Sequence, residues 1–180
     1  MKLINRNTVT LILIVNGLYG CARLTFPKRD NLSDLSRNLN SLNGYYRNSA
    51  VDTSQMNLWH VLNNKVWKDT SLDKYNPQYL FVELIVKDNH SVTANLFNDT
   101  FLIGQKVLKG KIKGNYFSVR RKVNYLGVPL IYMKESEWKL QLGKDQNGNL
   151  HVDAAYFSAK IIFIASGGID SNDNSVYQLK

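Results

Sequence analysis

The stretch that decides the fold reads Val107-Leu108-Lys109-Gly110-Lys111-Ile112-Lys113-Gly114-Asn115-Tyr116-Phe117-Ser118-Val119-Arg120-Arg121-Lys122. Gly114-Asn115 matches the residues that two-residue hairpin turns favour. With such a turn, Lys113 lies opposite Tyr116, and successive pairs point to alternate faces of the sheet. The sequence therefore predicts an antiparallel hairpin at this point.

The predicted register gives this hairpin one mostly apolar face and one basic face. On the apolar face we expect the pairs Leu108 with Arg121, Gly110 with Val119, and Ile112 with Phe117. On the other face we expect Lys113 with Tyr116, Lys111 with Ser118, Lys109 with Arg120, and Val107 with Lys122. Like charges placed opposite each other, as at Lys109 and Arg120, weaken strand pairing. The cations of this face therefore indicate a role outside stability.

Five cations on this face are the candidate contact residues. They are Lys109, Lys111, Lys113, Arg120 and Lys122. A row of cations suits anionic lipid head groups or an acidic partner. A face that only keeps the domain soluble and prevents edge-to-edge aggregation is the alternative interpretation.

Short strand-like segments continue on both sides of the hairpin. They cover residues 79–87, 91–97, 105–113, 116–123, 129–134, 137–143, 149–157 and 160–165. This regular spacing is typical of an antiparallel sheet, and so many consecutive strands must close or form two layers to protect their edges. We therefore predict a mostly β domain over residues 42–166, either a single up-and-down barrel or a strongly curled sheet of about eight strands.

The segments around this domain are more polar. Leu58, Val61 and Leu62 share a helical spacing, which predicts a short helix near residues 57–64. Residues 21–41 are expected to form a polar tether, although three leucines at helical spacing could form a turn or two within it. Residues 167–180 are expected to form a polar C-terminal tail, whose last apolar residues could still dock.

The amino terminus has the features of an export signal. Lys2 and Arg6 precede a short apolar run in residues 9–15, which is too short to span a membrane as a helix. The next residues, Leu18-Tyr19-Gly20-Cys21, resemble the lipobox of bacterial lipoprotein precursors. The resemblance implies cleavage between Gly20 and Cys21 and acylation of Cys21, which would anchor the chain in a membrane. An incidental cysteine at position 21 is the alternative.

The position after the cysteine bears on the choice of membrane. Residue 22 is Ala, whereas an acidic residue there retains many members of this family in the inner membrane. The resemblance therefore favours the outer membrane of the bacterial envelope. Cys21 is also the only cysteine of the chain, so no intramolecular disulfide is expected.

A second resemblance concerns the folded domain. Gly44-Tyr45-Tyr46, followed by a meander of about eight strands, resembles the start of a lipocalin-like barrel, with Tyr46 in place of the usual tryptophan. This resemblance implies a barrel that holds an apolar ligand. Aromatic side chains such as Trp59, Trp138 and Tyr156 would line such a cavity, or they simply fill the core.

Composition limits the partners. Removing residues 1–20 removes Lys2 and Arg6 and no acidic residue, so the formal charge falls from +9 to +7. Outside the cytoplasm, an anionic membrane or an acidic partner is a better counter-charge for such a chain than nucleic acid. We therefore expect no nucleic-acid partner.

The sequence contains few features that indicate a catalytic site. His60, His90 and His151 are isolated in the sequence, and no zinc-site spacing, Gly-x-Ser-x-Gly elbow or Walker loop occurs. His151 and Asp153 share a strand face, where we expect a solvent-facing polar pair. The sequence thus predicts a non-enzymatic protein without metal or cofactor.

Two functions remain open. The first is an envelope lipoprotein that binds a hydrophobic or amphiphilic small molecule in a barrel. The second is an envelope accessory protein that has a filled core and acts through Lys109, Lys111 and Arg120.

Overall fold

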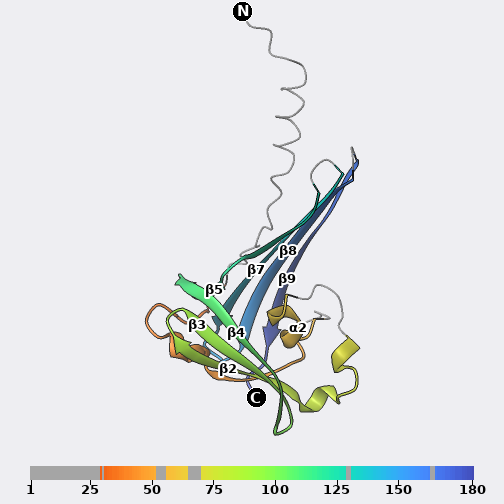
Figure 1. The fold of residues 1–180 in the computed structure, drawn as a ribbon. Helices are drawn as coiled ribbons and strands as arrows, with labels where there is room; N and C mark the ends of the chain where they lie inside the picture. Colours follow the sequence, from red (N-terminus) through yellow and green to blue (C-terminus); the bar gives the residue numbers. More distant parts are fainter. Residues whose placement is uncertain (1–28, 30, 52–55, 65–69, 129–130, 163–164) are drawn as a thin grey trace, which may run out of the picture.

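A computed structural model describes residues 29, 31–51, 56–64, 70–128, 131–162 and 165–180. The lipobox, including Gly20 and Cys21, lies outside the described residues. Within them the chain is mostly β, with nine strands and one α-helix (Figure 1).

The strands are β1 (Gly44–Arg47), β2 (Leu80–Asp88), β3 (Ser91–Asn98), β4 (Phe101–Lys113), β5 (Tyr116–Val119), β6 (Lys122–Val128), β7 (Tyr132–Lys144), β8 (Leu150–Ile162) and β9 (Ala165–Tyr177). The helix is α2 (Leu58–Leu62), and short 3₁₀ turns are η1 (Leu39–Leu42), η2 (Thr70–Leu72) and η3 (Pro77–Tyr79). The helix predicted near residues 57–64 is thus confirmed.

All nine strands belong to one antiparallel sheet. Its order is β1-β2-β3-β4-β5-β7-β8-β9, so almost every strand pairs with the next one in the sequence. β5 and β6 both pair with β7, β5 near the end of β7 and β6 along its first half. The sheet is not closed by a strand ladder. Two backbone hydrogen bonds nevertheless join β1 to the C-terminal residues, from Arg47 N to Gln178 O (2.9 Å) and from Lys180 N to Tyr45 O (2.7 Å).

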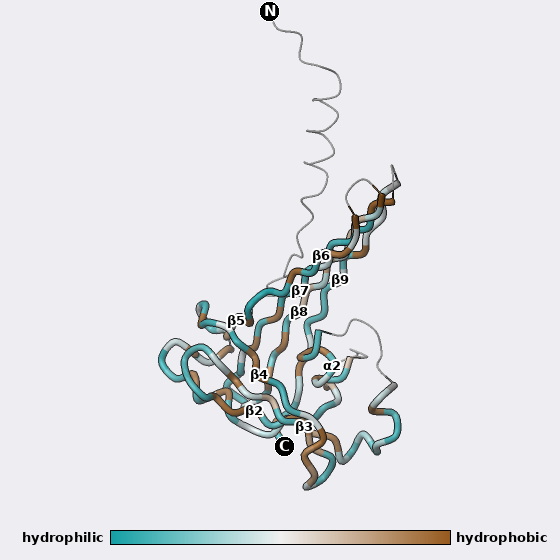
Figure 2. Tube along the Cα trace, in the orientation of Figure 1, coloured by the Kyte–Doolittle hydropathy of each residue, from teal (hydrophilic) through white to brown (hydrophobic). Residues whose placement is uncertain are grey.

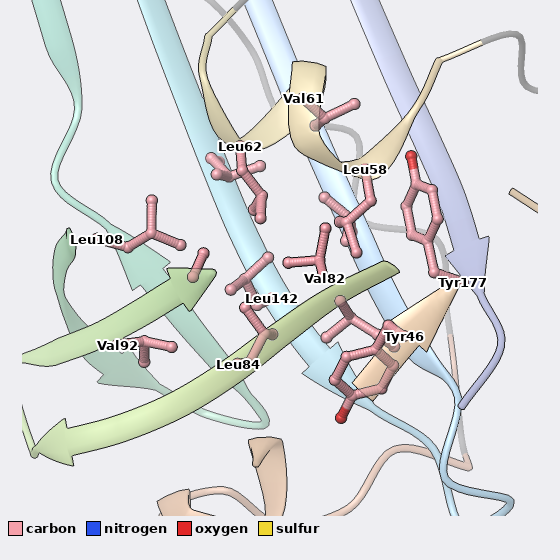
Figure 3. Close-up of a cluster of buried hydrophobic side chains, with 14 of the residues drawn as sticks. Tyr46, Leu58, Val61, Leu62, Val82, Leu84, Val92, Leu108, Leu142 and Tyr177 are labelled. Carbon is pink, nitrogen blue, oxygen red and sulfur yellow. The ribbon is translucent and has the colours of Figure 1, made fainter. Parts of the chain in front are cut away.

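The core lies inside the curl of the sheet (Figure 3). Leu58, Val61 and Leu62 of α2 are fully buried there, because this one helical turn presents its apolar side to the inner face of the strands. Leu84 and Leu142 meet them from opposite parts of the sheet. The interior is therefore packed with apolar side chains from the sheet and from α2.

The N-terminal segment also contributes to the core. Leu35 and Leu42 are completely buried, and Leu39 is nearly so. Tyr46 is buried beside this segment and donates a hydrogen bond from its hydroxyl to Leu42 O, at 2.9 Å. The described part of the expected tether therefore packs against the domain instead of spacing it from the membrane.

The sheet has two parts with different surroundings. The body contains β1 to β5, α2 and the halves of β7, β8 and β9 next to them. The other halves of β7, β8 and β9, together with β6, project from the body as a long arm (Figure 1). We call the described residues within 122–137 and 156–171 the arm, and those within 125–132 and 161–166, at its far end, the arm tip.

Three expectations about the strands change. Two segments were predicted at 129–134 and 137–143, but residues 132–144 form one strand, β7. Two more were predicted at 149–157 and 160–165, but residues 150–162 form one strand, β8. The expected loose tail is wrong for residues 167–177, which form most of β9 and pair with β8. These strands extend farther than predicted because most described side chains of the arm are exposed or half-buried, with Glu137 and Ser158 as buried exceptions, so the sequence shows no regular alternation.

No α-helix among the described residues has the length and apolar character needed to cross a membrane.

Candidate functional site

The central hairpin forms as predicted around Gly114-Asn115. Lys113 pairs with Tyr116, and Ile112 pairs with Phe117. Gly114 has a φ of +57° while Asn115 does not have a positive φ, which is the pattern of a turn with glycine at its first central position. Phe117 is fully buried and Lys111 is exposed, so the predicted division into an apolar and a basic face is confirmed.

The predicted pairing fails farther from the turn. The β4–β5 ladder ends at Gly110 and Val119, and one more backbone hydrogen bond runs from Arg120 N to Lys109 O at 2.7 Å. Lys122 does not pair with Val107. It pairs with Trp138 of β7 instead, because the chain leaves β4 after Arg120 and enters the arm.

This change also moves Lys122 to the other face. Lys122 shares its side of the sheet with its partner Trp138, which is part of the core cluster. Burial lowers the pKa of Lys106, and the nearby charge of Lys122 lowers it further. Lys106 points away from the side of Lys109, since the two positions differ by three residues along β4. Lys122 is therefore not part of the predicted basic face.

The remaining four cations form what we call the basic face. They are Lys109, Lys111, Lys113 and Arg120, and all are exposed. None of them has a carboxylate within ion-pair distance among the residues that the structure describes. The basic face thus presents positive charge that the described part of the domain does not neutralise.

A buried polar cluster lies on the outer face of β7 and β8. Asp153 is fully buried and forms an ion pair with Arg29, whose Nη2 lies 3.0 Å from Asp153 Oδ1. Gln141 Nε2 donates a second hydrogen bond to Asp153 Oδ2 at 2.9 Å. Burial raises the pKa of the neighbouring Tyr116 hydroxyl, and the charge of Asp153 acts in the same direction. The N-terminal segment is thereby fixed to the sheet at Arg29.

A second polar group lies at the turn between β7 and β8. His151 Nε2 lies 3.1 Å from Asp145 Oδ2, and the backbone amide of Asn149 donates to Asp145 Oδ1 at 2.8 Å. Burial acts to raise the pKa of Asp145, but the hydrogen bonds from His151 and Asn149 outweigh it and lower the pKa overall. These contacts hold the turn at residues 145–148, which joins β7 to β8.

The expectation of a solvent-facing pair at His151 and Asp153 is wrong. Their exposed fractions are 7% and 0%, and each has a separate partner, so they do not act together. The error arises because Arg29 and residues 31–33 cover this face: Ser33 N donates to Lys144 O at 2.7 Å, and Leu32 forms an isolated bridge with Asp145. No local pattern signals that contact, which joins residues more than a hundred positions apart.

The other candidate residues, histidines and aromatics, do not form one site. His60 is buried in α2, and His90 is exposed at the turn between β2 and β3. Trp138 and Tyr156 lie in or against the core, with ring centroids 5.9 Å apart. No group of three or more metal-ligating side chains comes together within the described parts of the chain.

The arm tip is a third surface, and the sequence reasoning did not single it out. Its exposed apolar side chains are Tyr125, Leu126, Val128, Ile131 and Ile162. Val128, Tyr132 and Ile162 lie side by side in the register of β6, β7 and β8. Figure 2 shows the apolar colouring concentrated at this end of the arm. The run Ile161-Ile162 and its surroundings could have indicated the surface, but the sequence alone assigns it equally well to a core.

A scan against protein-family models gives no match to this chain, and neither do searches of curated proteins and of solved structures.

Proposed function

We propose that this chain is a bacterial envelope lipoprotein that acts without enzymatic chemistry, as an accessory protein presenting its basic face to an anionic surface or an acidic partner. The observation that carries the proposal is the set of four exposed cations, Lys109, Lys111, Lys113 and Arg120, without carboxylate partners in the described domain. The packed interior supports it as well, because side chains from α2 and from residues 35–42 occupy the space inside the curled sheet.

The basic face is built to stay exposed. Phe117 and Leu108 are anchored in the core, which fixes the hairpin. Lys111 and Lys113 then point outward from the same strand at alternate positions, so their spacing of two residues corresponds to about 7 Å. Such a row suits the separation of phosphates or carboxylates on an extended anionic surface.

The experiment neutralises Lys109, Lys111 and Arg120 together by substitution with Gln. We expect the variant to lose association with phosphatidylglycerol vesicles beyond what the lipid anchor supplies, and the natural chain to lose the same increment at high salt because salt screens exposed charges. The matched control replaces Arg37, Lys74 and Lys87, which are exposed elsewhere, so the net charge is the same. Unchanged association of the first variant would exclude the basic face as a contact surface.

The anchor is a separate part of the proposal. Cys21 would carry the acyl chains, and two or three chains exceed the single chain that gives only marginal membrane binding. Ala22 supports the outer membrane as the location. Metabolic labelling with a fatty acid, compared between the natural chain and Cys21→Ser, tests this part. Equal labelling of the two chains would overturn the lipoprotein assignment.

A second candidate is a barrel that binds a hydrophobic or amphiphilic small molecule. The observation in its favour is that residues 178–180 join β1, so the first and last strands of the curled sheet approach each other around an apolar interior. Native mass spectrometry of the chain after exposure to an envelope extract distinguishes the candidates. A retained small molecule supports the barrel, and a retained protein supports the accessory function.

A further inference from the structure

We propose that the arm tip enters the same membrane leaflet that holds the lipid anchor, so that the protein is attached to the membrane at two points. The inference rests on the proposed acylation of Cys21 for the anchor, and on the arm alone for the second contact. It assigns a lipid-binding site to the exposed apolar side chains of the arm tip, which are Tyr125, Leu126, Val128, Ile131 and Ile162.

The arm tip has exposed apolar side chains and no charged residue. Leu126 is 66% exposed and Val128 is 60% exposed, on a strand that faces solvent on both sides. Residues 123–133 and 161–169 contain no Lys, Arg, Asp or Glu. Two adjacent hairpin ends without any charge are unusual on a water-exposed surface, where exposed apolar patches mark interaction sites.

A row that contains two paired lysines borders the arm tip. Lys134 of β7 lies directly opposite Lys160 of β8, with Leu126 on the other side of Lys134. Like charges in register are unfavourable in a sheet, but anionic head groups would neutralise them. Tyr125 lies one residue before this row, opposite Glu135, and Tyr132 lies two residues beyond it, opposite Val128. The two tyrosines therefore flank the row, and tyrosine is enriched where membranes meet water. From body to tip, the order is thus the pair of Tyr125 and Glu135, then the row with Lys134 and Lys160, then uncharged residues that are mostly apolar.

The length of chain between Arg29 and Cys21 limits how far the anchor can lie from the body. Arg29 is fixed to Asp153, and Cys21 lies eight positions before it in the sequence, which gives a reach of at most about 29 Å. Ile162 is nine residues beyond Asp153 on the same strand, at a distance of about 30 Å. A fully extended chain would therefore let the anchor lie about as far from Asp153 as Ile162 does, so one membrane surface can hold both.

The depth of the apolar part suits one leaflet. From the row of Lys134 to Ile131 the strand and its turn rise about 10 Å. Interfacial segments bury about 5–10 Å of apolar surface, and half of the hydrocarbon core is about 15 Å thick. The tip is long enough to pass the head groups and too short to cross the membrane.

A site-specific label tests the insertion. A fluorophore is attached to Val128→Cys in the full chain, which is then reconstituted in phosphatidylethanolamine–phosphatidylglycerol vesicles containing nitroxide-labelled lipid. The matched control carries the label at Leu102→Cys, since Leu102 is 53% exposed at the end of the β3–β4 hairpin, away from the arm tip (Figure 1). We expect lipid quenching at position 128 and none at position 102.

A second pair of variants tests the chemistry of the contact. Leu126→Glu with Ile162→Glu should abolish lipid quenching of the label at position 128. Phe101→Glu with Leu102→Glu should leave it unchanged, although these side chains are as exposed, at 72% and 53%. Lack of quenching at position 128 in the otherwise natural chain would overturn the proposal. Crosslinking of the label sites between copies without lipid quenching would also overturn it and assign the tip to self-association.

The readouts separate this inference from the proposed anchor. The intact mass of the purified chain reports whether Cys21 is acylated, independently of the label. Acylation without quenching at position 128 rejects the tip contact alone. Quenching without acylation rejects the lipoprotein assignment and leaves the tip as the membrane contact.

Discussion

Strand β8 passes through both parts of the molecule, and the comparison of its two halves explains much of the structure. In the body, Leu150, Val152 and Ala155 are completely buried. In the arm, Lys160 and Ile162 are exposed. The strand is nevertheless paired with β7 and β9 along its whole length. Backbone pairing therefore continues where burial stops, so the two halves depend on different forces.

The largest effect should come from the buried half of the sheet. Leu142→Ala removes a fully buried side chain from the core and should lower the free energy of unfolding by about 2–5 kcal/mol. Ile162→Ala in the arm should change it by less than about 0.5 kcal/mol, since the side chain is half exposed. Urea unfolding measures both. Equal losses would contradict the division into body and arm.

The buried ion pair should have the next largest effect. Arg29→Leu leaves the Asp153 carboxylate buried without its cation, at a cost of about 1–3 kcal/mol in unfolding free energy, because release of the N-terminal segment limits the penalty. The matched control is Arg37→Leu, which breaks the exposed pair with Asp34 and should cost less than about 0.5 kcal/mol. A similar cost for both variants would show that Arg29 does not hold the segment in place.

Acidification should weaken the body through Asp145. Its pKa is lowered in the fold, so its contribution to stability is present above the unfolded value of about 3.9 and is lost as the pH falls through the folded pKa. The difference in urea midpoint between the natural chain and Asp145→Asn should therefore shrink as the pH falls from neutral to acidic. A difference that stays constant with pH would mean that the hydrogen bonds from His151 and Asn149 do not favour the charged carboxylate.

The smallest effect should come from the arm tip. Leu126→Glu with Ile162→Glu should change the unfolding free energy by less than about 0.5 kcal/mol, because both side chains are exposed and a surface change seldom costs more. Urea unfolding and circular dichroism check this. A clear destabilisation would show that the tip packs against something within the protein itself.

The hairpin of β4 and β5 was predictable from the sequence because it has one buried face. Ile112 and Phe117 alternate with Lys111 and Ser118, which fixed the register of the hairpin. Gly148, with a φ of +89°, lies in the turn between β7 and β8. The pattern of alternating residues reports burial on one side, and this condition fails in the body half of β8, where residues 150–155 are all buried.

The arm was not predictable because most of its described side chains are exposed or half-buried, so its strands show no regular alternation. Residues 134–137 read Lys-Glu-Ser-Glu, which suggests a break, yet they lie in the middle of β7. Residues 166–175 are almost entirely polar or glycine, which suggests a tail, yet they pair with β8. Strands with solvent on both faces need no alternation, so their sequences resemble loops. The contact of Arg29 with Asp153 was missed because it joins distant parts of the chain.

The long β7–β8 ladder also has a mechanical consequence. It pairs Tyr132–Lys144 with Leu150–Ile162, thirteen residues against thirteen, and it runs lengthwise from the body into the arm. A force along the arm would load its hydrogen bonds in parallel, in shear, instead of opening them one after another. The arm is therefore suited to carry tension between its tip and the body.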